Sequence, residues 1–204
     1  FEELLEINPD VVGWIYCEDT VINYPILKGE DNDFYLHHDI NRNYSVSATI
    51  FQEAYNSDLF ADANNLLYGH HMADGSMFAG LEKFKEPGYY EAHPIMWLFT
   101  PEQSYKILLF SSYVTDAWSD AYVIYTTTGP TLDKYIQERL ELSDFQADVE
   151  FSGKDKLALL STCDYTFNNA RYVVHGILRP VQLVPEGEEE AFLQKQAELQ
   201  NQES

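Results

Sequence analysis

Cys163 is the residue of this chain best placed for covalent chemistry. It ends an apolar, strand-like run at residues 157–162 and precedes the polar segment 164–170. A thiol where a strand meets a loop is accessible and held on a rigid element, which suits a nucleophile. Only the thiolate attacks a carbonyl well, so a neighbouring group must accept its proton or stabilise its charge. The alternative is a buried structural cysteine, which position alone favours because free cysteines are commonly buried.

Arg171 and His70 could supply the groups that such a nucleophile needs. Arg171 follows the same loop, and if the flanking runs pair as a hairpin it faces Cys163 and could donate hydrogen bonds to an oxyanion. His70 follows a short strand-like run and Gly69, and its imidazole could exchange protons with the thiol or with a leaving amine. For Arg171 the alternative is a surface ion pair, which is common in so acidic a chain. Taken singly, each of the three residues is ambiguous.

The remaining histidines and the second cysteine are interpreted as structural or incidental. Adjacent histidines at 37–38 and 70–71 suggest a metal, but neighbours on an extended chain point to opposite faces. No Cys and His spacing matches a zinc site, so we expect no metal. Cys17 is expected in a polar turn without a nearby histidine, and a disulfide between the two cysteines stays open.

The elements that must position these residues are mostly short strands. Runs rich in β-branched and aromatic residues predict strands at 20–27, 48–52, 65–69, 95–100, 105–114, 156–162 and 172–178. Helical patterns occur at 1–7, 31–39, 76–84 and 130–142, the last beginning with a proline. This order favours an α+β fold, mostly β, with helices inserted in the connections of a barrel.

Length and charge limit the classes of protein and partner. The chain has 204 residues, enough for one domain with a sizeable core. The net charge of −22 argues against a nucleic-acid partner and against a basic patch that docks on anionic lipid. No apolar run could span a membrane, so we expect an excised soluble domain at 1–184 and an acidic tail at 185–204.

Several stretches in the same order resemble the sortase family, class B. Residues 160–163 (Leu-Ser-Thr-Cys), followed by Arg171, resemble the cysteine motif T-L-x-T-C…R. Residues 68–72 (Tyr-Gly-His-His-Met) resemble the histidine motif Y-G-H-[NH]-M, and 8–15, 24–26, 31–36, 49–51 and 75–78 also look class B. The resemblance runs from about Ile7 to about Val181. One departure is Leu159 in place of the first Thr, within the apolar run and away from its reactive end.

The resemblance implies an eight-stranded β-barrel with N-terminal helices and a helix before the cysteine strand. It implies a two-step transpeptidation in which Cys163 attacks the Thr carbonyl of a sorting motif in a secreted protein. An amine of a peptidoglycan precursor or a pilin lysine then resolves the thioacyl-enzyme. His70 would be the general acid and base, and Arg171 would hold the carbonyl oxygen. The implied substrate contacts are Asn32, Leu36, Tyr122 and Ser161.

The same resemblance implies no metal or organic cofactor and a place on the outer face of the cell membrane, through an N-terminal anchor outside this chain. Two other functions stay open. A hydrolytic cysteine peptidase would cleave the same peptides without joining them to an added amine. A non-catalytic surface domain on a sortase-like barrel is disfavoured because Cys163, His70 and Arg171 are all present.

Overall fold

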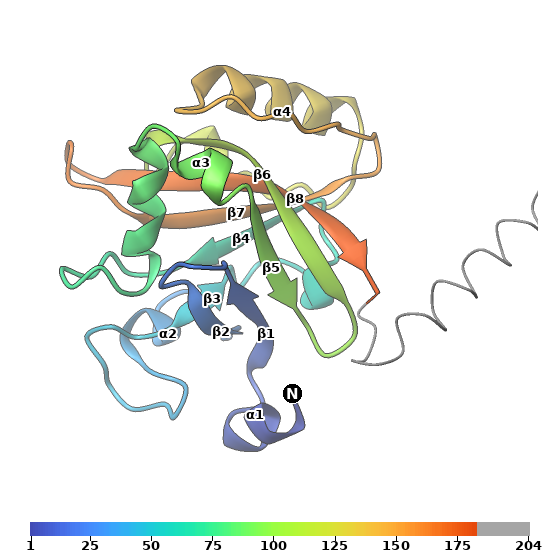
Figure 1. Ribbon diagram of the computed structural model, residues 1–204. Coiled ribbons are helices and arrows are strands. Elements are labelled where there is room, and N and C mark those ends of the chain that lie inside the picture. Colours follow the sequence, from blue (N-terminus) through green and yellow to red (C-terminus); the bar gives the residue numbers. More distant parts are fainter. Residues whose placement is uncertain (183–204) are drawn as a thin grey trace, which may run out of the picture.

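Eight strands close into a barrel in the computed structural model, which describes residues 1–182 (Figure 1). They are β1 (Val11–Tyr16), β2 (Asn23–Leu27), β3 (Ile50–Gln52), β4 (Asn64–Tyr68), β5 (Ile95–Phe99), β6 (Ser104–Asp116), β7 (Lys156–Cys163) and β8 (Ala170–Val181). Their order around the barrel is β1-β2-β3-β4-β7-β8-β6-β5, and β5 pairs back with β1. The β2–β3 and β4–β7 pairs are parallel and the others antiparallel. The predicted eight-stranded, mostly β fold is confirmed.

Helices lie in the connections between the strands, apart from α1, which precedes β1. The α-helices are α1 (Glu2–Ile7), α2 (Phe34–His37), α3 (Tyr89–Ala92) and α4 (Pro130–Leu142), and the 3-10 helices are η1 (Asp58–Phe60), η2 (Phe78–Lys85) and η3 (Asp120–Tyr122). In Figure 1, α4 lies outside the barrel, beyond β6, β7 and β8. It buries Leu132, Tyr135 and Ile136 against Phe110 and Ile177. This is the predicted helix before the cysteine strand, with Pro130 in its first turn.

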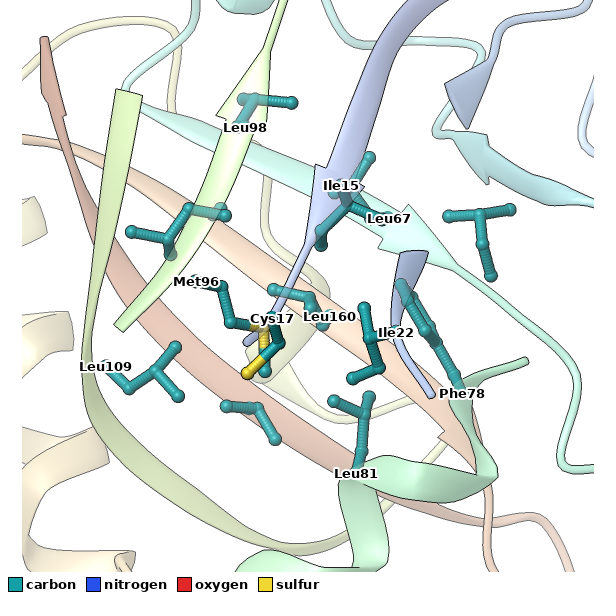
Figure 2. Packing of buried hydrophobic residues seen from close by; sticks show 14 of the residues in the cluster. Ile15, Cys17, Ile22, Leu67, Phe78, Leu81, Met96, Leu98, Leu109 and Leu160 are labelled. Carbon is teal, nitrogen blue, oxygen red and sulfur yellow. The ribbon is translucent and has the colours of Figure 1, made fainter. Parts of the chain in front are cut away.

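The barrel interior is a continuous apolar core. Figure 2 shows side chains from β1, β4, β5, β6, β7 and η2 meeting inside it, among them Ile15, Leu67, Met96, Leu98, Leu109, Leu160, Phe78 and Leu81. Cys17 belongs to this core, with 1% of its surface exposed, and burial raises the pKa of its thiol. Its side chain therefore lies in the core rather than in a polar turn. Both cysteines are free, which closes the question of a disulfide.

The strand β1 and the helix η2 differ from the sequence-based prediction. β1 was not predicted as a strand because Val11–Tyr16 carries apolar residues on both faces and contains Gly13. A Cβ at Gly13 would lie 2.9 Å from the Phe99 carbonyl oxygen, so glycine allows the close pairing with β5. The helix predicted at 76–84 is the 3-10 helix η2, which begins only at Phe78 because Met77 has a left-handed φ of 57°.

One predicted strand is shorter in the structure, and one predicted segment lies outside the described residues. The strand predicted at 20–27 begins at Asn23, since Thr20 makes a turn in which its Oγ1 accepts from the Ile22 amide. The predicted acidic tail at 185–204, with the domain boundary before it, lies outside the described residues. Within residues 1–182, no helix has the length and apolarity to cross a membrane.

Candidate active site

The β7–β8 hairpin brings Cys163 and Arg171 together. In the antiparallel register of these strands Cys163 stands opposite Arg171, and the next amide, of Asp164, donates to the Ala170 carbonyl oxygen at 3.0 Å. Cys163 is half-buried, so its thiol is neither fully enclosed nor fully exposed. The arrangement that the sequence suggested, with the two residues facing each other where the loop begins, is therefore observed.

His70 reaches the same end of the barrel through the parallel pairing of β4 and β7. Tyr68 pairs with Ser161, and the Gly69 amide donates to the Ser161 carbonyl oxygen at 3.1 Å. Continuing this register by two residues past the end of β4 would set His70 level with Cys163 on the neighbouring strand. A Cβ at Gly69 would overlap Ile50 Cδ1, so only glycine fits immediately before the histidine.

The three residues line one groove of about 810 Å³. Its walls come from the segment leading into α2, from β3 and β4, from residues 117–123 around η3, and from the end of β7. All seven predicted site residues are among its lining: Asn32, Leu36, His70, Tyr122, Ser161, Cys163 and Arg171. A groove of this size could accept several residues of an extended peptide.

Contacts of the His70 ring fix its orientation. Its Nε2 lies 2.7 Å from the carbonyl oxygen of Leu36 in α2. A carbonyl oxygen only accepts hydrogen bonds, so this Nε2 carries a proton and Nδ1 is the ring nitrogen left to exchange one. Histidines held in this way by a backbone carbonyl have a defined tautomer, which a group that transfers protons requires.

Arg171 and Cys163 are not engaged with each other or with His70 in this state. Arg171 Nη1 donates to the Ala170 carbonyl oxygen at 2.9 Å, and no carboxylate in the described part of the chain forms an ion pair with it. Among residues 1–182, Cys163 Sγ makes no hydrogen bond. Such contacts often form only when substrate binds, so the guanidinium and the thiol remain available to a ligand in the groove.

The groove lining contains a short hydrogen bond between two predicted residues. Tyr122 OH lies 2.7 Å from Ser161 Oγ. Burial raises the pKa of Tyr122 to about 12, so its hydroxyl stays neutral near physiological pH. A neutral phenol and a serine hydroxyl can each donate or accept, which gives this wall adaptable polar groups beside Cys163.

Glu53 is a residue of the site that sequence reasoning missed. The residue is 7% exposed, and its carboxylate accepts hydrogen bonds from the Asn32 side-chain amide and, at 2.8 Å, from Tyr68 OH. Asn32 also accepts from the Ala54 amide at 2.8 Å, so its side chain is held at both ends. Glu53 is one of 34 acidic residues, and no local pattern distinguishes it from those that face solvent.

Aromatic rings line the rest of the groove, and of these the sequence singled out only Tyr122. Phe51, Tyr68 and Tyr122 follow one another with ring centroids 5.3 Å and 6.3 Å apart. Trp118 also lines the groove and is 86% exposed. Phe51 and Tyr68 fall within the motif stretches, which could have indicated them, whereas Trp118 lies in a connection without a recognisable pattern.

Comparison with known proteins decides the family. No family model matches the chain. The chain is 38% identical over 180 residues to sortase B of Listeria monocytogenes serovar 1/2a, which covers 86% of this chain and 72% of that protein. The chain belongs to the sortase B family. Membership makes it a cysteine transpeptidase and confirms the predicted class of enzyme.

Solved sortase B structures share the barrel described above. A Staphylococcus aureus sortase B–substrate complex has a TM-score of 0.84 and 32% sequence identity, and the match covers 89% of this chain and 85% of that one. A sortase B complexed with triglycine has a TM-score of 0.81 and 34% identity, covering 89% and 86%. The fold of this sortase B homologue and its mixed parallel and antiparallel barrel therefore agree with the family.

Proposed function

We propose that this sortase cleaves a sorting motif near the C-terminus of secreted proteins after its Thr and transfers the acyl group to an amine. The acceptor is an amine of a peptidoglycan precursor or a pilin lysine. The observation that carries the proposal is the strand register that brings His70, Cys163 and Arg171 to one end of a single groove. The relatives solved with a substrate and with triglycine support a peptide substrate and an amine acceptor.

In the first step, the thiolate of Cys163 attacks the carbonyl carbon of Thr and forms a C–S bond. The oxygen becomes an oxyanion, which accepts hydrogen bonds from the Arg171 guanidinium. The C–N bond then breaks while His70 donates a proton to the departing nitrogen. The products are a free amine on the departing peptide and a thioacyl-enzyme at Cys163.

In the second step, the acceptor amine attacks the thioester and gives its proton to His70. The C–S bond breaks, a new amide forms, and Cys163 leaves as a thiolate. The contact between His70 Nε2 and the Leu36 carbonyl oxygen supports this role because it leaves Nδ1 to take up and release the proton. His70 therefore acts once as an acid and once as a base, and no net proton is consumed by the enzyme.

The sorting motif occupies the groove between α2 and the η3 segment. Leu36 offers an apolar contact, and Asn32, Tyr122 and Ser161 offer hydrogen bonds to the peptide. Asn32 is suited to this because Glu53 and the Ala54 amide fix its side chain. The enzyme works on the outer face of the cell membrane, where secreted substrates and cell-wall amines meet.

Turnover of sorting-motif peptides tests this function. A panel of fluorogenic peptides is incubated with and without an amine acceptor, using the wild-type chain, Cys163→Ala and Arg171→Lys. We expect amine-dependent ligation that Cys163→Ala abolishes. Arg171→Lys keeps the charge but not the planar fork, so kcat should fall by about 10²–10³-fold. Cleavage without ligation would refute transfer, and activity that survives Cys163→Ala would refute the nucleophile.

A further inference from the structure

The residues that follow the three site residues point to the other side of their strands. Successive side chains on an extended chain alternate between two faces. His71 follows His70, Asp164 follows Cys163, and Tyr172 follows Arg171. All three of these neighbours are in contact with η2, either with Lys85 or with Glu82.

Lys85 connects two of the neighbours directly. Its Nζ lies 2.5 Å from Asp164 Oδ2 and 4.8 Å from the centroid of the Tyr172 ring. The same Nζ donates to Glu82 Oε1 at 3.0 Å. The other Glu82 oxygen lies 2.9 Å from His71 Nε2, close enough for an ion pair although off the hydrogen-bond direction. We call Lys85 and Glu82 together the rear bridge.

The ion pair between Lys85 and Asp164 is the strongest contact of the rear bridge and also the most buried. The Asp164 side chain is 1% exposed, whereas that of Lys85 is 36% exposed. Burial alone would raise the pKa of Asp164, but hydrogen bonds from Lys85 and from the Thr166 amide outweigh it and hold that pKa well below its usual range. Asp164 is therefore a buried carboxylate, and Lys85 is the cation that balances it. Removing the Lys85 cation leaves the buried carboxylate of Asp164, next to Cys163, without a balancing charge. The loop that carries Asp164 must then move to bring this carboxylate to water.

The helix that carries the rear bridge is itself fixed to the barrel. Phe78 and Leu81 are fully buried in the core, where Figure 2 shows both side chains pointing inward. The Phe78 amide donates to the His70 carbonyl oxygen at 3.0 Å, and Met77 pairs with His71 across an isolated bridge. Lys85 and Glu82 thus extend from a rigid support, and their contacts can hold the strand ends in place.

We propose that Lys85 is a positioning residue, which together with Glu82 holds His70, Cys163 and Arg171 in register from behind the groove. The inference rests on the roles proposed above for these three residues. Lys85 is not among the groove-lining residues, so it acts on the chemical step rather than on peptide binding. A misplacement of about 1 Å in a reacting group can cost about 10²-fold in rate. Loss of Lys85 should therefore lower kcat and leave KM unchanged.

Three lysine variants test the proposal. Lys85→Met removes the charge and keeps most of the stem, and Lys85→Arg retains a cation. Lys83→Met is the matched control, because Lys83 is an exposed lysine of the same helix that faces the Tyr89 ring at 5.9 Å. Two properties are measured: kcat and KM with a sorting-motif peptide, and the rate of alkylation of Cys163 by iodoacetamide from about pH 5 to 9. Mass spectrometry confirms the site, since Cys17 is buried.

For Lys85→Met we expect kcat at least about tenfold lower, KM within about twofold, and an altered alkylation profile. Lys83→Met should match the wild type, and Lys85→Arg should recover most of the loss. The proposal is overturned if Lys85→Met keeps the wild-type kcat and alkylation profile, or if Lys83→Met loses as much. Alkylation needs no turnover, so a wild type inactive on every peptide would defeat the proposed function and still leave the effect of Lys85 measurable.

A second variant covers the case in which Lys85→Met does not fold, as judged by near-ultraviolet circular dichroism. Glu82→Gln preserves the size of the side chain and removes the charge that contacts both Lys85 and His71. Glu82→Gln should also lower kcat and leave KM unchanged. If Glu82→Gln then shows the wild-type kcat and alkylation profile, the proposed role of the rear bridge is overturned.

Discussion

Removing the carboxylate of Asp120 should loosen the groove wall that carries Tyr122. Arg139 of α4 donates to the two Asp120 oxygens at 2.9 and 3.1 Å. Tyr135 of the same helix donates to the Ala121 carbonyl oxygen at 2.7 Å. These three hydrogen bonds hold η3 on α4, and Tyr122 is the last residue of η3. The change Asp120→Ala removes two of them.

The expected loss of stability follows from the burial of the two partners. The Arg139 side chain is 4% exposed and that of Asp120 is 66% exposed. Removing one partner of a fully buried ion pair costs about 3–5 kcal/mol, but here water already screens the carboxylate and can reach the vacated position. Arg139 also retains its cation–π contact with Tyr135, whose ring centroid lies 4.7 Å from the guanidinium carbon. We therefore expect a loss of about 2 kcal/mol, equivalent to about 4–8 °C in Tm for a domain of this size.

Urea unfolding followed by circular dichroism measures this loss, with the m value checked for constancy. The control is Glu138→Ala, since Glu138 Oε2 lies 3.6 Å from the same guanidinium without a hydrogen bond to it, and this change should cost less than about 1 kcal/mol. In Asp120→Ala, KM for the peptide should rise while alkylation of Cys163 stays unchanged. A loss below about 0.5 kcal/mol, or one equal to that of Glu138→Ala, would refute the reasoning.

Two further predictions concern a buried histidine and a crowded glycine. Burial lowers the pKa of His175 to about 3. Between about pH 6.5 and 3 the unfolded chain therefore binds a proton that the folded chain excludes. The free energy of unfolding should fall by up to about 1.4 kcal/mol for each pH unit as the pH is lowered through this window. His175→Gln should reduce this slope in urea unfolding across that window, and an unchanged slope would contradict the assignment. At Gly69, where a Cβ would overlap Ile50 Cδ1, alanine should cost about 1–3 kcal/mol in thermal unfolding and lower kcat by displacing the histidine that follows. Gly153→Ala has open space around it and is the control; equal effects of the two alanines would exclude crowding as the cause.

The parts of the site that are local in the chain were predictable from the sequence. Cys163 and Arg171 flank one loop, so a simple hairpin was enough to suggest that they face each other. The helix at 130–142 was predictable because its proline start and its apolar spacing are both local signals. His70 was a candidate from its own position, but only the family resemblance connected it to the cysteine, because no local pattern does.

The parts that depend on distant segments were not predictable in the same way. The parallel pairing of β4 with β7 joins residues about 90 positions apart, and a parallel register leaves no turn signal in the sequence. Glu53 and Lys85 resemble ordinary surface charges until the fold brings partners to them. β1 was missed because both of its faces carry apolar residues, so the alternation that marks a half-buried strand is absent.

The order of strands around the barrel has a consequence for how the enzyme folds. β7 and β8 are the last strands within residues 1–182, yet they lie between β4 and β6. Without them, the first six strands form an open sheet with two unpaired edges, and β6 alone presents 13 residues. Such edges readily pair with other chains, and closing them requires contacts between distant segments, which form slowly.

The hairpin that closes the barrel also carries Cys163 and Arg171. A chain that has made only its first six strands has His70 but neither Cys163, the proposed nucleophile, nor Arg171, the proposed oxyanion donor. Activity and barrel closure are thus acquired in the same event, and an incompletely folded chain has no reactive centre with which to acylate itself or its neighbours.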